Sequence, residues 1–64
     1  MNYALMLSIS DEAITEFERV REAITYQDKF DNGGYKEFFP QLNHAPDTYI
    51  ASWDDVRGWV NIQE

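Results

Sequence analysis

The amino-acid sequence predicts a single small α+β domain with its elements in the order β-α-β-β-α. Three observations support this fold class. A short apolar run near the N-terminus has the length of a buried strand, and the segment after it repeats apolar residues at helical spacing. The second half then alternates short aromatic and β-branched runs with Pro and Gly breaks. At 64 residues the chain has material for one core, so we expect one domain over residues 1–64.

Residues 3–9 are expected to form the first strand. The run from Tyr3 to Leu7 is continuously apolar, and Ser10 and Asp11 close the segment. A run this short that leads directly into a helix-start signal favours a buried strand over a helix.

Residues 10–30 are expected to form one long amphipathic helix. Ser10 is a suitable N-cap, because its hydroxyl can accept a hydrogen bond from a free backbone N–H of the first turn. An apolar stripe follows at spacings of three and four residues: Ile14, Phe17, Val20 and Ile24. Acidic residues occupy the solvated surface of the same helix: Glu12, Glu16, Glu18 and Glu22.

Residues 31–34, Asp-Asn-Gly-Gly, are expected to end this helix, because Asn and Gly readily adopt the left-handed conformation found just past a last helical turn. Two short strands should follow, over residues 35–39 and 48–51. Both are rich in aromatic or β-branched residues, and Pro40 prevents the first from continuing as a central strand. Residues 41–47 are then a loop.

The last segment, residues 52–62, has two interpretations. A short helix is favoured, because Ser52 with Asp55 three residues later resembles a capping box. The alternative is a hairpin in which residues 49–52 pair with residues 58–62. Gly58 supports the hairpin, since glycine inside a helix costs about 1 kcal/mol relative to alanine.

The charge balance limits the kinds of partner. Twelve Asp and Glu residues against five Lys and Arg residues make a formal charge of −7. Nucleic acids and anionic membranes reward cationic contacts to phosphate, so we expect neither as a direct partner. A protein with a basic surface fits better. The chain also lacks an apolar run typical of a signal peptide or membrane span, so we expect a cytoplasmic protein. Because the sequence starts at Met1 and carries no tag, we expect a complete small open reading frame.

No constellation of residues indicates catalysis or a bound cofactor. The single histidine, His44, lies in a loop with Asp47 as its nearest carboxylate, which is fewer than the three protein ligands of a typical catalytic zinc. Gly33 and Gly34 follow the predicted helix, whereas a phosphate-binding loop precedes one. We therefore expect no enzyme activity, no cofactor and no metal, and interpret His44 as a surface residue.

Surface recognition is the remaining route to function, and two groups of side chains could provide it. The first is acidic and includes Glu12, Glu16, Glu18, Glu22, Asp47, Asp54 and Asp55. In a helix, Glu12 and Glu16 would stand one turn apart, about 6 Å along the axis, and duplex DNA carries a charge about every 3.4 Å per strand. A row of carboxylates on a compact domain can therefore present a phosphate-like potential to a basic groove. The second group is aromatic. Ten rings are more than a small core hides, so Trp53, Trp59 and Tyr35 are candidate contact residues.

These features favour a small, acidic, non-catalytic binding protein. The first hypothesis is an inhibitor from a phage or mobile element, of the anti-defence or anti-CRISPR kind, acting in the host cytoplasm. It would block a basic nucleic-acid-binding surface of a host enzyme by DNA mimicry. The alternative is an antitoxin, immunity or adaptor-like module that binds through exposed aromatic rings, including to a second copy of itself as a homodimer.

Overall fold

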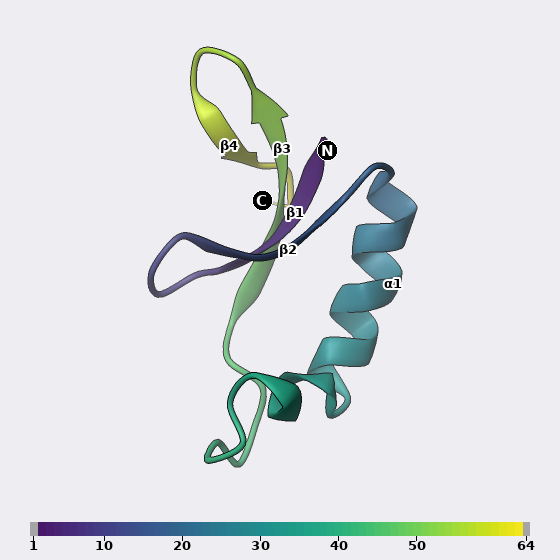
Figure 1. The fold of residues 1–64 in the computed structure, drawn as a ribbon, viewed down its shortest axis with the longest axis vertical. Helices are drawn as coiled ribbons and strands as arrows, with labels where there is room; N and C mark the ends of the chain where they lie inside the picture. The colour runs from purple at the N-terminus through teal and green to yellow at the C-terminus, as the bar shows by residue number, and fades with distance from the viewer. Residues whose placement is uncertain (1, 64) are drawn as a thin grey trace.

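The computed structural model describes residues 2–63 and confirms the α+β class. Its elements are, in chain order, β1 (Tyr3–Leu7), β2 (Glu12–Phe17), α1 (Val20–Asp31), the 3-10 turn η1 (Gly34–Glu37), β3 (Thr48–Asp54) and β4 (Gly58–Asn61). The four strands form one antiparallel sheet in the order β2-β1-β3-β4, with α1 lying along one side of it (Figure 1). The predicted class is therefore right, but the order of elements differs from β-α-β-β-α.

The first strand forms where the sequence predicts it, but it is shorter. β1 ends at Leu7 rather than at residue 9 and lies in the middle of the sheet, paired with β2 on one edge and β3 on the other. Its central residues Ala4, Leu5 and Met6 are fully buried, at 0–2% exposed. A strand covered on both faces and both edges needs a continuously apolar sequence, and this explains the run.

The predicted helix over residues 10–30 is wrong in its first half. Residues 8–11 form a turn and residues 12–17 form β2, which pairs with β1 from Tyr3↔Phe17 to Leu7↔Glu12. Asp11 occupies the left-handed region at φ 55°, which Asp tolerates better than most residues. Pairing with β2 satisfies the backbone groups along one edge of the buried β1, and this tertiary gain outweighs the local helix signal.

A β-bulge explains why the apolar spacing in β2 looked helical. The register shifts between Leu5 and Met6, so that Ile14 is the extra residue of β2. Ile14 and Phe17 both pack against the core beneath α1, three positions apart as on a helix face. The stripe is therefore real, but a bulged strand produces it.

The helix α1 begins at Val20 and ends where the sequence predicts. Glu22 Oε1 accepts a hydrogen bond from the Arg19 backbone N–H at 3.2 Å, which is half of a capping box. At the other end Asn32 donates from its backbone and side-chain amides to the Asp28 carbonyl, at 3.1 and 2.8 Å. Gly33 follows at φ 129°, a conformation that L residues rarely adopt, and turns the chain away.

The strand predicted over residues 35–39 is instead the 3-10 turn η1 and the bend after it. The Tyr35 carbonyl accepts the Phe38 and Phe39 amide N–H groups at 3.0 and 2.8 Å. A Cβ on Gly34 would lie 3.0 Å from the Lys29 carbonyl oxygen, so the chain folds back tightly against the end of α1. These local bonds take the place of strand pairing and deliver the Tyr35 ring into the core.

Residues 52–62 adopt the alternative, a hairpin, and the favoured helix is wrong. β3 pairs with β4 from Ala51↔Asn61 to Asp54↔Gly58, which places Trp53 directly opposite Trp59. Asp54 Oδ1 accepts the Val56 and Arg57 backbone N–H groups at 2.8 and 3.0 Å, closing the turn. Gly58 ends the turn at φ 79°, a geometry that suits glycine and does not occur inside a helix.

Because Asp54 closes the β3–β4 turn, we expect the stability of this hairpin to fall in acid. The backbone N–H of Arg57, and then that of Val56, lowers the pKa of the Asp54 carboxyl by stabilising its charged form. Because the folded pKa is depressed, this stabilisation is present above the unfolded pKa of Asp and is lost as pH falls through the folded value. We expect Asp54→Ala to lower the thermal unfolding midpoint at neutral pH. Below about pH 4 the midpoint of this variant should fall less with decreasing pH than that of the unchanged protein. Thermal melts of Asp54→Ala and Asp55→Ala from neutral pH to below about pH 4 test this prediction. The same dependence of the midpoint on pH in both variants would contradict it.

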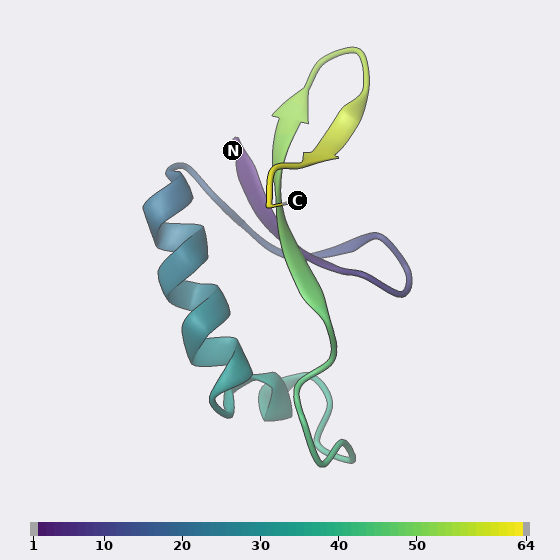
Figure 2. The same ribbon diagram turned by 180° about the vertical axis from the view of Figure 1, so that it is seen from behind.

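The core lies in two layers, one on each face of the sheet. Under α1 the buried residues are Leu5, Ala23, Phe30, Tyr35 and Ile50. On the opposite face a smaller cluster is formed by Ala4, Met6 and Ala51, with the Tyr49 and Trp59 rings packed against it. Viewed from behind, α1 again lies to one side of the strands, and no helix within residues 2–63 lies over the other face (Figure 2). Side chains alone cover that face.

Candidate functional site

The candidate site is the open face, defined as the sheet face opposite α1. Alternation along each strand places its side chains there. They are Asn2 just before β1, Ala4 and Met6 on β1, Ala13 and Glu16 on β2, Tyr49, Ala51 and Trp53 on β3, and Trp59 and Asn61 on β4. The residues of β1 and β2 on this face carry no ring, whereas the three large rings lie on β3 and β4, so the open face is aromatic at one side.

Two tryptophans form the centre of this aromatic surface. Trp53 and Trp59 are cross-strand partners, and their ring centroids lie 5.1 Å apart at 74°, a T-shaped pair. Trp59 packs against the buried cluster of Ala4, Met6 and Ala51, whereas Trp53 is 50% exposed. An exposed indole supported by a second, partly buried one is a rigid apolar surface, which costs little conformational entropy when a partner contacts it.

Carboxylates accompany the rings. Trp53 Nε1 donates to Asp55 Oδ1 at 3.1 Å, and the Tyr49 hydroxyl donates to Asp11 Oδ1 at 2.8 Å. Burial raises the pKa of the Tyr49 phenol, and the hydrogen bond to Asp11 and its negative charge raise that pKa further. Each of these rings is therefore oriented by an acidic side chain at the rim of the open face.

A shallow pocket joins the tryptophan pair to a third carboxylate. It is lined by Asn2, Glu16, Trp53 and Trp59 and has a volume of about 420 Å³. Glu16 reaches it because β2 pairs Glu16 with Ala4, whose small side chain leaves room above β1. The pocket thus combines two aromatic rings, a carboxylate and an amide on one surface.

Four of the predicted contact residues come together here. Glu16, Trp53 and Trp59 line the pocket, and Asp55 is bonded to Trp53. Glu16 and Asp55 are 39 positions apart in the sequence; the sheet order brings Glu16 into the pocket with Trp53, and Asp55, in the turn after β3, is bonded to that ring.

The predicted helical ladder of glutamates does not form. Glu12 and Glu16 lie on β2, where Glu12 stands opposite Leu7 on the helix side of the sheet and Glu16 lies on the open face. Glu18 is in the connection to α1, and Glu22 is in the first turn of α1, bonded to Arg19. Period-two alternation therefore separates carboxylates that a helix would have stacked on one side.

The other three predicted residues have different positions. Asp54 closes the β3–β4 turn, and Asp47 precedes β3 with its carbonyl bonded to the Ser8 backbone N–H at 3.0 Å. Tyr35 was expected on the surface, and this is wrong: its ring is 5% exposed and lies edge-on to Phe30 in the core. The turn at Gly33 and Gly34 turns Tyr35 inward, so it belongs to the core beneath α1.

Sequence reasoning missed Asn2 and Asp11 as members of the site. Asp11 was interpreted as part of a helical first turn, and Asn2 carries no signal of its own. One usable signal was present in β3, where Tyr49, Ala51 and Trp53 alternate with period two. A strand continued through Trp53 would have placed Tyr49 and Trp53 on the same face.

Charge is distributed unevenly between the helical segment and the sheet. Residues 18–37, which contain α1 and η1, carry five acids and four bases. Residues 2–17 and 38–63, which contain the sheet and its turns, carry six acids and one base, Arg57. Most of the negative excess of residues 2–63 therefore belongs to the sheet and its turns, which include the open face.

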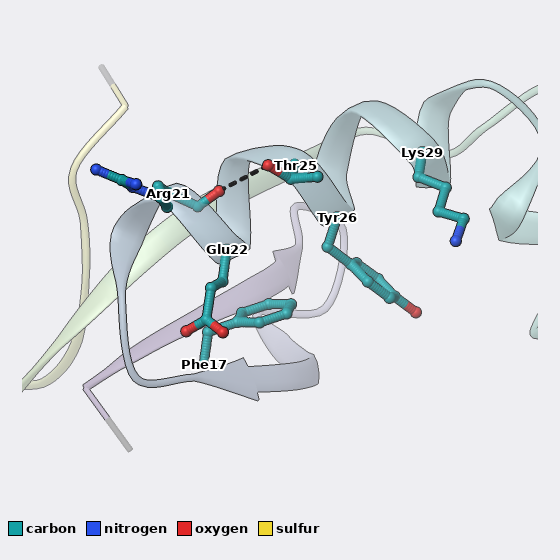
Figure 3. Close-up of a pocket in the computed structure, with 6 residues that line it drawn as sticks. All are labelled: Phe17, Arg21, Glu22, Thr25, Tyr26 and Lys29. Atoms are coloured by element: carbon teal, nitrogen blue, oxygen red, sulfur yellow. Dashed lines mark hydrogen bonds between the residues drawn. The ribbon is translucent and has the colours of Figure 1, made fainter.

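A second pocket lies on the helix side, between β2 and α1 (Figure 3). Phe17 and Tyr26 form its apolar wall with their rings 5.4 Å apart, and Arg21 and Lys29 lie toward its opposite ends. Its volume is about 410 Å³. Thr25, also in its lining, is bonded to the Arg21 carbonyl at 3.0 Å. Basic and acidic side chains both line this pocket. Its two rings are partly buried, so they offer a partner less aromatic surface than the half-exposed Trp53 does.

Within residues 2–63, no group of three or more His, Cys, Asp or Glu side chains is arranged to hold a metal ion. The same residues contain no helix with the length and apolarity needed to cross a membrane. Comparison with protein-family models, with curated proteins and with solved structures gives no significant match to this chain.

Proposed function

We propose that this domain is a protein-binding module whose open face docks on a basic surface of a partner protein. The observation that carries the proposal is the half-exposed Trp53, supported by Trp59, on the face of an acidic sheet. Rings of this kind supply affinity when they are desolvated, and surrounding carboxylates supply orientation and a faster encounter with a cationic partner.

Charge complementarity selects the partner class. Six acids against one base in the sheet and its turns would repel nucleic acid and attract a surface rich in Lys and Arg. The two recognition routes expected from the sequence, acidic and aromatic, therefore become one proposal, because Glu16 and Asp55 lie beside the same tryptophans. The function proposed is an inhibitor or adaptor that works by occupying a site, in the cytoplasm.

Trp53→Ala is expected to weaken the complex about tenfold or more, since buried Trp anchors are typical hot spots. The full chain is immobilised to capture partners from an extract of its natural host, and the purified partner is then titrated by calorimetry. The matched control is Ile24→Ala, because Ile24 is 51% exposed on α1, about as much as Trp53, but lies in the other layer. Circular dichroism verifies that both variants are folded.

Salt dependence separates the charge contribution from the aromatic one. Affinity should fall steeply between about 50 mM and about 500 mM NaCl, because the carboxylates at the rim are solvent-exposed and screened.

A partner whose binding is weakened by Ile24→Ala and not by Trp53→Ala, or one that is a second copy of the chain, would contradict the proposal.

The inhibitor hypothesis makes one further demand on the partner. If the open face occupies a nucleic-acid site, then duplex DNA or RNA that the partner binds should compete with this domain for it. Competition measured with labelled nucleic acid distinguishes this inhibitor from an adaptor, for which the two ligands bind together.

A further inference from the structure

We propose that the pocket between Trp53, Trp59 and Glu16 receives the guanidinium group of an arginine side chain on the partner. This inference rests on the function proposed above and specifies its central contact. It follows from the composition of the pocket, which places two indole rings, one carboxylate and one amide around a single space of about 420 Å³.

The rings favour a planar cation. The T-shaped pair, with centroids 5.1 Å apart, leaves Trp53 half exposed, so part of its ring surface is open to a group that stacks on it. Cations bind to Trp faces by attraction to the ring quadrupole, and Arg does so more often than Lys because its guanidinium is flat and weakly hydrated. An apolar partner side chain would use the rings but leave the carboxylate beside them desolvated and unpaired.

The polar groups favour a forked donor. Asp55 and Asp11 already accept hydrogen bonds from Trp53 and Tyr49, whereas none of the side chains between residues 2 and 63 donates to Glu16. A carboxylate with both oxygens available matches the two parallel N–H groups of a guanidinium. Asn2 also lines the pocket, and its side chain has one carbonyl oxygen that can accept a hydrogen bond.

The pocket between β2 and α1 is a poor site for this ligand. The pocket between β2 and α1 is lined by Arg21 and Lys29, which would repel a guanidinium, and its carboxylate, Glu22, is bonded to the Arg19 backbone. The pocket on the open face has no Lys or Arg among its lining residues. Charge therefore favours the open face over the pocket between β2 and α1, and a third pocket, lined by Ser8, Ile9, Pro46 and Asp47, has a carboxylate but no aromatic ring.

Three capped peptides test the inference: Gly-Arg-Gly, Gly-Lys-Gly and Gly-citrulline-Gly. Each is titrated into the full chain, and the indole N–H resonances of Trp53 and Trp59 are followed by NMR. We expect the arginine peptide to shift both resonances and to bind about threefold or more tightly than the lysine peptide. Citrulline has nearly the same shape without the charge, and should bind at least about tenfold more weakly than arginine.

Two isosteric variants on the same strand locate the contact. Glu16→Gln should weaken arginine binding about tenfold. Glu12→Gln removes the same charge from the helix side of β2 and should change the affinity less than about twofold. Equal affinities for arginine and lysine, equal effects of the two variants, or no indole shift with any peptide would overturn the inference. The proposed function is judged separately, because it stands or falls on the effect of Trp53→Ala on the captured partner.

Discussion

Phe30→Ala is expected to lower the free energy of unfolding by about 3–5 kcal/mol, the usual cost of deleting a buried aromatic ring. Phe30 is 1% exposed, and its ring centroid lies 6.3–6.5 Å from those of Tyr26, Tyr35 and Phe38. It is therefore the residue that joins α1 to η1 and the bend after it. A core of this size rarely supplies more than about 3–5 kcal/mol, so most molecules of the variant should be unfolded at 25 °C.

The matched control is Phe38→Ala. Phe38 belongs to the same aromatic group but is 46% exposed, so its removal leaves no closed cavity and should cost about 1 kcal/mol or less. Urea unfolding followed by circular dichroism measures both. If the two variants lost similar stability, Phe30 would not be the centre of this core.

Gln63→Ala is expected to cost about 1–3 kcal/mol, a large effect for a residue next to the end of the chain. Gln63 Oε1 accepts the Ile50 backbone N–H at 2.8 Å, at a point of β3 beyond the last residue of β4. Its side-chain amide also pairs reciprocally with that of Gln27 on α1, at 3.0 and 2.9 Å. One side chain thus completes the hydrogen bonding of β3 and connects the C-terminal segment to the helix.

Gln27→Ala separates these two roles. It removes the amide pair and the bond from Gln27 to the Thr48 hydroxyl at 3.2 Å, but leaves Gln63 on the Ile50 N–H. Gln63→Ala should therefore be the more damaging variant, because it alone leaves a part-buried backbone donor without its partner. Denaturant midpoints test the order, and hydrogen exchange at the Ile50 amide should accelerate only in Gln63→Ala.

About half of the fold follows from local patterns in the sequence. The sequence predicts three features correctly: the apolar run of β1, the end of α1 at Asp31 and the strand that begins at Thr48. Each of them depends on residues that are close together in the sequence. The candidate site was only partly accessible in this way. Trp53, Trp59, Glu16 and Asp55 were named individually, but their meeting on one face depends on the sheet order.

Composition and short-range pattern determined the α+β class, the negative charge and the position of the helix end. Tertiary structure decided that residues 12–17 and 58–61 are strands and which face each side chain occupies. The physical reason is that a strand is stabilised by partners distant in sequence. β1 requires a neighbour on both edges, and the bulge at Ile14 lets a sequence with helical spacing supply one of them. The open face, with Glu16 beside the two tryptophans, exists only after that pairing is made.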